Sequence, residues 1–145
     1  MRVMLDTNIL VSAFVFRSKK IYSTIDYIVS KHELVLSTYV IEELRDVIAR
    51  KFPKMAVELD EFLTTLSFTL AYSPQRMEPL FKIRDPADYP VLHTAIIEEI
   101  DILITGDKDF DDIEIEKPTI MTVAEFAKSY ILGSPFGRAV GGNAD

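Results

Sequence analysis

Apolar and polar positions recur along this chain in two periods, which predict strands and helices in turn. Short apolar runs predict buried strands at residues 2–5, 33–37, 102–105 and 120–122, and an alternating segment predicts an edge strand at 68–72. Apolar residues at helical spacing predict helices over residues 8–16, 19–31, 39–51, 53–66, 86–99 and 123–132. Strands that alternate with helices are typical of a parallel sheet covered on both faces. We therefore expect an α/β fold, a three-layer α/β/α sandwich with a mainly parallel central sheet.

The length of the chain fits one domain. Its 145 residues suffice for one hydrophobic core and are too few for two ordinary domains. We expect this domain to span residues 1–132, because Gly133 marks the end of the last predicted helix. Residues 133–145 have a loose composition, and we expect them to form a flexible tail.

Composition excludes several kinds of site. The chain has no cysteine, so disulfides, thiolate nucleophiles and thiolate zinc sites are excluded. Only two histidines occur, His32 and His93, in different predicted elements, which disfavours a histidine-rich metal site. His93 falls off the apolar face of its predicted helix, and we expect it at the surface.

No apolar run approaches the roughly 20 residues that a membrane-spanning helix needs. The apolar N-terminal stretch contains Asp6 and Asn8, and we interpret it as a strand followed by a helix rather than as a signal peptide. We expect a cytoplasmic protein without membrane contact.

Four acidic residues lie just after predicted strands or near the starts of predicted helices: Asp6, Glu43, Asp88 and Asp107. In an open α/β sheet, ligands bind beyond the carboxyl ends of the strands. Carboxylates crowded there repel one another and stay ionised when a cation shares the site. The pattern therefore indicates a divalent metal ion, and with it chemistry on phosphates.

Helical geometry separates the adjacent residues Glu42 and Glu43. On a helix over residues 39–51, Glu42 lies roughly 160° from the centre of the apolar stripe and Glu43 roughly 100° from it. Glu42 is therefore expected in solvent. Glu43 lies at the border of the buried face, where it can reach over the strand ends, and it is the candidate of the two.

Each acid also has a structural alternative. Asp6 is placed to cap the helix after it, and Glu43 lies near a helix N-terminus, where the dipole favours an acid. Asp88 follows Asp85–Pro86 in a pattern like a capping box, although it also lies on the apolar face of its helix. Asp107 is placed to cap a short helix. These alternatives require four coincidences in one small sheet, whereas a single metal site explains all four acids.

The acids occur in four segments, which in chain order read MLDTNIL, STYVIEEL, RDPADYPVLHTA and LITGDKDF. In this order and at this spacing they resemble the PIN-domain family, and in particular its stand-alone members described as toxins of toxin–antitoxin systems. The resemblance covers about residues 2–130. It implies a parallel α/β/α sandwich and a ribonuclease that depends on Mg²⁺ or Mn²⁺. It also implies a homodimer and a small antitoxin protein as partner.

By motif position, the resemblance carries over specific residues. The family's catalytic and metal-binding cluster falls on Asp6, Glu43, Asp88 and Asp107, with Asp109 as an accessory acid and Asn8 and Thr105 as supporting polar residues. We hypothesise that these carboxylates hold one or two Mg²⁺ or Mn²⁺ ions for the hydrolysis of RNA.

Substrate contacts are less visible in the sequence. The net charge of −7 counts against passive binding of a polyanion, but it is compatible with an acidic centre that metal ions neutralise. Basic residues near the acidic motifs are candidates for phosphate contacts: Arg17, Lys19, Lys20, Arg45 and Lys108. Tyr39 and Tyr89 are candidates for base stacking, with core or interface packing as the alternative.

Two other functions remain open at this point. A phosphatase of the haloacid-dehalogenase type would have a second Asp two residues after Asp6, where this chain has Asn8, so a magnesium-dependent phosphatase is disfavoured. A non-catalytic module that binds RNA or protein is the other alternative. A catalytic protein should lose cleavage in Asp107→Asn, whereas a module should bind equally well with or without metal.

Overall fold

Five parallel strands form one central sheet in the order β3-β2-β1-β4-β5. The structure is a computed structural model that describes residues 1–82, 86–106, 110 and 113–132. The strands are β1 (Arg2–Leu5), β2 (Glu33–Ser37), β3 (Thr69–Ala71), β4 (Ile102–Ile104) and β5 (Thr119–Met121). The predicted parallel sheet is confirmed, with β3 at its edge. The tail predicted for residues 133–145 lies outside the described residues.

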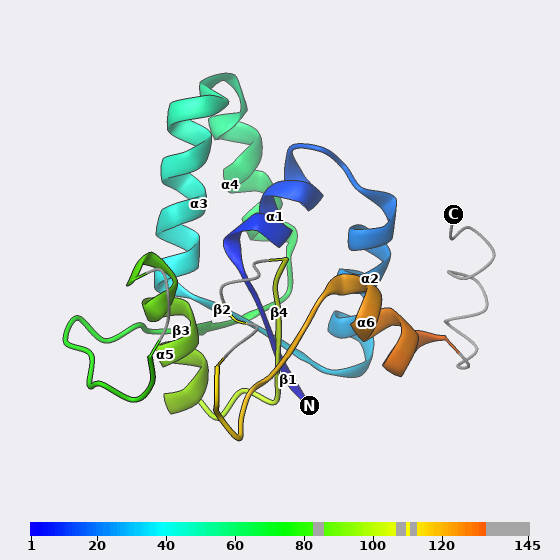
Figure 1. The fold of residues 1–145 in the computed structure, drawn as a ribbon. Coiled ribbons are helices and arrows are strands. Elements are labelled where there is room, and N and C mark those ends of the chain that lie inside the picture. Colours follow the sequence, from blue (N-terminus) through cyan, green and yellow to red (C-terminus); the bar gives the residue numbers. More distant parts are fainter. Residues whose placement is uncertain (83–85, 107–109, 111–112, 133–145) are drawn as a thin grey trace.

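Helices cover the sheet on both sides. They are α1 (Thr7–Phe14), α2 (Lys19–Lys31), α3 (Thr38–Lys51), α4 (Ala56–Thr65), α5 (Tyr89–Ile97) and α6 (Val123–Phe126), with short turns η1 (Pro53–Met55), η2 (Pro86–Asp88) and η4 (Ala127–Ile131). Helices α2 and α6 lie on one side of the strands, and α3, α4 and α5 gather on the other (Figure 1). The chain is thus an α/β/α sandwich.

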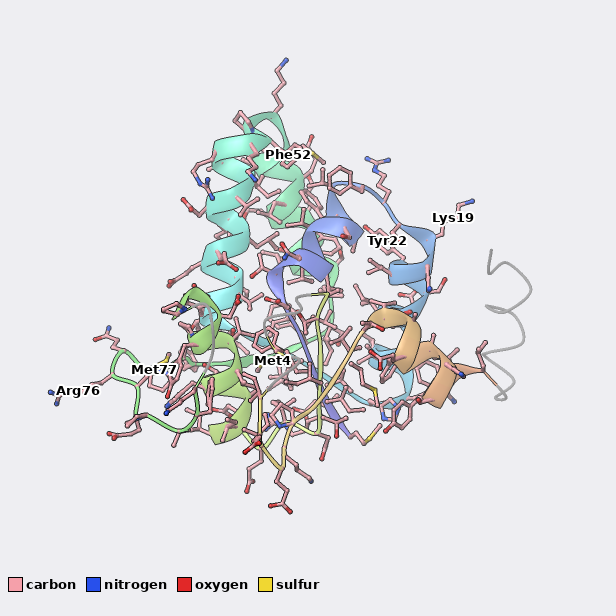
Figure 2. The ribbon with its side chains drawn as sticks, in the orientation of Figure 1. Met4, Lys19, Tyr22, Phe52, Arg76 and Met77 are labelled. Carbon is pink, nitrogen blue, oxygen red and sulfur yellow. The ribbon has the colours of Figure 1, made fainter. Side chains whose placement is uncertain are left out.

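The core is centred on the three middle strands. Val3, Met4 and Leu5 of β1 are fully buried, as are the apolar residues of β4 beside them. Figure 2 shows Met4 in the middle of the packed side chains. Burial on both faces explains why these strands read as continuous apolar runs rather than as alternating segments.

Three predicted helices differ from the observed ones in detail. The helix expected over residues 86–99 begins as the 3₁₀ turn η2, because Pro90 in the first turn of α5 cannot donate a helical hydrogen bond. It ends at Ile97, and Glu99 has a left-handed backbone with φ of 54°. The segment 53–66 likewise opens with η1, and 123–132 divides into α6 and the π-helical turn η4.

Strand order creates a crevice at the centre of the sheet. The chain runs outward from β1 through β2 to β3, then returns to place β4 on the other side of β1. Loops after β1 and β4 therefore leave the sheet in different directions, and the space between their carboxyl ends is where open α/β sheets bind ligands. Leu5 pairs with Ile104, so Asp6 and Thr105 follow at the same level of this edge.

A polar connection holds α3 against α5. The backbone N–H of Ser73, just after β3, donates to the Thr38 hydroxyl at 3.0 Å. The Ser73 hydroxyl lies 2.8 Å from that of Thr94, a buried residue of α5. The first turn of α3 and the middle of α5 are thereby tied through one residue at the sheet edge, which fixes where their acidic side chains meet.

Candidate active site

Asp6 is buried at the carboxyl end of β1 and is held on both of its carboxylate oxygens. Its side chain is 6% exposed. The Thr105 hydroxyl donates to Oδ2 at 2.8 Å, and the backbone N–H of Thr7 donates to Oδ1 at 2.7 Å. Its own N–H donates to the Ile104 carbonyl at 3.1 Å, which extends the β1–β4 pairing by one residue. Asp6 therefore caps α1 and also presents a fixed carboxylate at the crevice.

Glu43 lies on the second turn of α3. It is partly buried, whereas Glu42 beside it is exposed, as the helical angles predicted. Tyr39 lies one turn earlier on the same helix, and the pKa of its phenol is raised first by burial and then by the negative charge of Glu43. The border position inferred from the sequence is thus where the structure places this acid.

Asp88 stands at the start of α5 and is partly buried. It occupies the N-cap position, but among the described residues its side chain makes no capping hydrogen bond to that helix. The capping-box alternative required Asp85 to be the N-cap, and Asp85 lies outside the described residues. A helix cap therefore does not account for the Asp88 carboxylate in the described part of the chain.

The three described acids meet around Tyr39. The pKa of this phenol is raised above its usual value of 10.0, first by burial and then by the negative charges of Glu43, Asp88 and Asp6. Screening by salt limits such effects to about 10 Å, so all three carboxylates lie in the neighbourhood of this phenol. Asp6 after β1, Glu43 on α3 and Asp88 before α5 therefore lie near one phenol at the same edge of the sheet.

The rest of the predicted cluster is only partly visible. Asp107, Lys108 and Asp109 lie outside the described residues. Thr105 makes the contact with Asp6 that a supporting residue would make, whereas Asn8 is exposed on α1. Among the residues that the structure describes, no three acidic or histidine side chains form a complete metal-holding group.

Comparison with known proteins identifies the fold family. The family model described as "PIN domain" matches residues 2–109. The chain belongs to the PIN-domain family. No curated protein matches the chain.

One solved structure is similar to this PIN domain over most of its length. It is the crystal structure of VapBC2 from Rickettsia felis bound to a DNA fragment from their promoter, with a TM-score of 0.64 and 16% sequence identity. The match covers 83% of this chain and 97% of the other. At this identity the likeness shows the shared fold.

The donor atoms of the PIN-domain site fit a hard divalent cation. Carboxylate oxygens are the ligands that Mg²⁺ and Mn²⁺ prefer, and the described side chains here offer no sulfur ligand. Two hydrogen-bond donors hold the Asp6 carboxylate in place. The negative charges of Asp6, Glu43 and Asp88 all act on Tyr39, so the electrostatic potential there favours a cation.

The basic candidates for RNA contact divide into two groups. Arg17 lies between α1 and α2, and Lys19 and Lys20 are the first residues of α2. All three are exposed, and Figure 2 shows Lys19 reaching away from the domain. None of the three forms an ion pair within the described part of the chain. Arg45 instead pairs with Asp60 of α4 at 2.5 Å, so its charge is already compensated within the fold.

The structure corrects the prediction for His93. It is 3% exposed, not at the surface, and its ring lies 5.7 Å from that of Tyr89. The Tyr89 ring is also stacked on that of Phe81, with 4.3 Å between the ring centroids. The next residue after His93, Thr94, donates a hydrogen bond to Ser73. The segment after β3 thus packs against a face of α5 that the helical pattern alone would leave in solvent.

Proposed function

We propose that this PIN domain is a metal-dependent endoribonuclease, which hydrolyses phosphodiester bonds of RNA, and that it is the toxin of a toxin–antitoxin pair. One observation carries the enzymatic part. Carboxylates from three separate elements, Asp6, Glu43 and Asp88, act on a single phenol at the carboxyl edge of the sheet in a PIN-domain chain. A binding module has no evident need for such a cluster, whereas phosphodiester hydrolysis does.

The chain's own residues have separate tasks in this proposal. Thr105 and the Thr7 amide orient the Asp6 carboxylate, and Tyr39 lies one helical turn before Glu43. The proposed metal ligands are Asp6, Glu43, Asp88 and Asp107, with Asp109 as an accessory acid. When bound, Mg²⁺ or Mn²⁺, as one or two ions, supplies Lewis-acid activation of water and stabilises charge on the phosphate. Because water is the nucleophile in this proposal, no side chain of the protein has to attack the phosphate.

Substrate RNA would approach along the exposed basic residues. Arg17, Lys19 and Lys20 have charges that no described acid compensates, so they are available for backbone phosphates. Arg45 would have to give up its pair with Asp60 to do the same, which makes it the weaker candidate. Lys108, next to Asp107 in sequence, belongs to the same proposed surface.

The toxin assignment is supported by the structural similarity and by an exposed aromatic surface. The similar solved structure is a VapBC2 assembly, which supports a small antitoxin protein as partner. Phe16 is 69% exposed and contacts Phe52 edge to face, and Tyr22 contacts Phe62 in the same way at the same end of the domain (Figure 2). Exposed clusters of this kind are typical of protein interfaces.

We also propose a homodimer and a cytoplasmic location. None of the helices in the described ranges is long and apolar enough to cross a membrane. Light scattering should give twice the 16.5 kDa mass of one chain. If Phe16→Ser abolishes self-association, the aromatic surface belongs to the homodimer rather than to the antitoxin.

The decisive experiment is RNA cleavage by the purified protein. A panel of structured RNAs should be cut with Mg²⁺ or Mn²⁺ and left intact with EDTA. Asp6→Asn should abolish cutting, and Asp26→Asn, which removes an exposed acid from α2, should not. Cutting that survives in Asp6→Asn would come from a contaminant or another site. RNA that is bound equally with and without metal, and never cut, would favour the non-catalytic module.

A further inference from the structure

An open cavity lies between the segment after β3 and the start of α5. Its volume is about 640 Å³, within the range of about 300–1,000 Å³ that is usual for ligand sites. Asp88, a proposed metal ligand, directly precedes one of its lining residues, so the cavity adjoins the acidic site. The lining residues come from two segments: Met77, Phe81 and Lys82 from the first, and Pro86, Tyr89 and Pro90 from the second.

Two stacked aromatic rings form part of the cavity wall. The ring of Phe81 lies on that of Tyr89, with 4.3 Å between the centroids and 15° between the planes. Both side chains line the cavity, and both are only partly buried. An aromatic stack that reaches an open cavity can be extended by one more flat ring, which is how many proteins hold unpaired nucleobases.

Hydrogen bonds and prolines give the cavity a fixed shape. The Tyr89 hydroxyl accepts from the Leu80 N–H at 2.8 Å and donates to the Glu78 carbonyl, so the start of α5 is tied to the segment after β3. Pro86 and Pro90, which also line the cavity, each have a locked φ angle. A site whose walls are already held in place loses little conformational entropy when a ligand enters.

Positive charge at the rim favours a ligand that carries phosphate. Lys82 lines the cavity and is exposed, and Arg76 is exposed on the same segment, where Figure 2 shows it reaching away from the domain. Neither forms an ion pair with any residue that the structure describes. A nucleotide combines a flat base with a negative phosphate, so it is complementary both to the aromatic wall and to the basic rim.

We propose that this cavity is a base subsite, which holds one unpaired base of a bound RNA against the Phe81–Tyr89 stack while Lys82 contacts the adjoining phosphate. That the polymer is RNA rests on the proposed function. A base inside a duplex has both faces covered by its neighbours and cannot enter the cavity unless it is unpaired. The substrate class is therefore RNA with an unpaired base close to the bond that is cut.

The test compares two single-stranded RNAs with the same number of phosphates. One is a short RNA of mixed sequence, and the other is an abasic chain of the same length. Their binding to the full-length protein is measured by fluorescence anisotropy in EDTA, so that neither is cut. Wild-type protein should bind the RNA with bases about fivefold or more tightly than the abasic chain, the contribution expected of one stacked base.

Variants then assign this preference to the cavity. Phe81→Leu keeps an apolar side chain and removes the ring, so it should lower the affinity for the RNA with bases to that for the abasic chain. Its affinity for the abasic chain should stay that of the wild type. Lys82→Gln should weaken the binding of both chains alike and reduce the salt dependence by about one phosphate contact.

Tyr72→Leu is the matched control. It also removes a ring from the segment after β3, but from a side chain that is 73% exposed and is not among the residues that line the cavity. It should keep the full preference for the RNA with bases. The same loss of preference in Tyr72→Leu and in Phe81→Leu would overturn the assignment to this cavity.

Failure of the subsite and failure of the proposed function give different results. Wild-type protein that binds both chains equally, or binds neither, would overturn the subsite, as would a Phe81→Leu variant that loses affinity for both chains alike. The nuclease proposal is decided separately, by metal-dependent cutting that disappears in Asp6→Asn. A preference for bases in a protein that cuts no RNA would overturn the nuclease proposal and keep the cavity as the base site of a binding module.

Discussion

The hydroxyl of Thr105 donates a hydrogen bond of 2.8 Å to Oδ2 of Asp6, between two residues that are 99 positions apart in sequence. Both side chains follow the last paired residues of adjacent strands, β1 and β4, on the two sides of the crevice. The bond is buried, and the Thr7 amide holds the other oxygen of the same carboxylate. Sheet register thus orients the one acid of the cluster that is almost fully enclosed.

Thr105→Val should loosen this carboxylate without changing the shape of the site. A buried charged acceptor that loses a donor destabilises the fold by about 1.5–3 kcal/mol. Cleavage of RNA should fall by about 10- to 100-fold, the usual effect of removing a partner from a metal ligand. Urea unfolding and initial cleavage rates measure the two effects.

The matched control is Thr119→Val, an identical replacement at an exposed position of β5. It should leave both quantities within experimental error of the wild type. If Thr105→Val and Thr119→Val lost the same stability and the same cleavage rate, the hydrogen bond to Asp6 would have no specific role in cleavage.

The neighbours Glu42 and Glu43 offer a second matched pair. Glu43→Gln should reduce RNA cleavage by two orders of magnitude or more, comparable to the several kcal/mol that a metal site contributes to phosphate chemistry. Glu42→Gln, which changes an exposed side chain, should cut within about twofold of the wild type, because exposed charges contribute little. Single-turnover rates at saturating Mg²⁺ are the measurement. Similar losses in both variants would exclude Glu43 as a specific ligand.

Much of the fold was predictable because its signals are local. Strands β1 and β2 and helix α2 begin and end where the apolar pattern placed them, since each is set by the residues it contains. The separation of Glu42 from Glu43 followed in the same way from the angle between consecutive helical residues. Such features need no knowledge of which elements are neighbours in space.

What the sequence did not reveal depends on contacts between distant segments. His93 is buried because residues after β3 pack against α5, and no helical pattern contains that information. Asp88 comes near Tyr39 because α3 and α5 pack together, with Ser73 linking Thr38 to Thr94 across them. The placement of Tyr39 and Glu43 on the same face of α3, by contrast, could have been found from their spacing of one helical turn.

Acid stability should depend on Asp101, at the opposite edge of the sheet from the acidic site. The pKa of Asp101 is lowered, chiefly because its carboxylate accepts a 2.7 Å hydrogen bond from the Arg2 backbone N–H, with Lys117 adding to the effect. A folded pKa below the unfolded one adds stability above the unfolded value, which is lost as pH falls through the folded pKa. Asp101→Asn should therefore be less stable than the wild type at neutral pH.

This difference should shrink as the pH falls below the ordinary aspartate value of 3.8. Thermal unfolding of both proteins from neutral to acidic pH measures it. Asp26→Asn, which removes an exposed acid, should show no such convergence. A gap between wild type and Asp101→Asn that stays constant at acidic pH would assign the loss to packing rather than to charge.

His93 should be dispensable for both folding and cleavage, although it is buried next to the proposed site. Both of its ring nitrogens are enclosed without a hydrogen-bond partner among the described residues. Burying unpaired polar atoms costs about 1–3 kcal/mol, and the ring contact with Tyr89 returns about 0.5–1.5 kcal/mol. His93→Leu removes both terms, so the free energy of unfolding should stay the same or rise by about 1 kcal/mol.

Urea unfolding and RNA cleavage of this variant are the measurements. A clear loss of stability would show that a nitrogen of His93 has a partner, and a loss of cleavage alone would place the imidazole in the catalytic site.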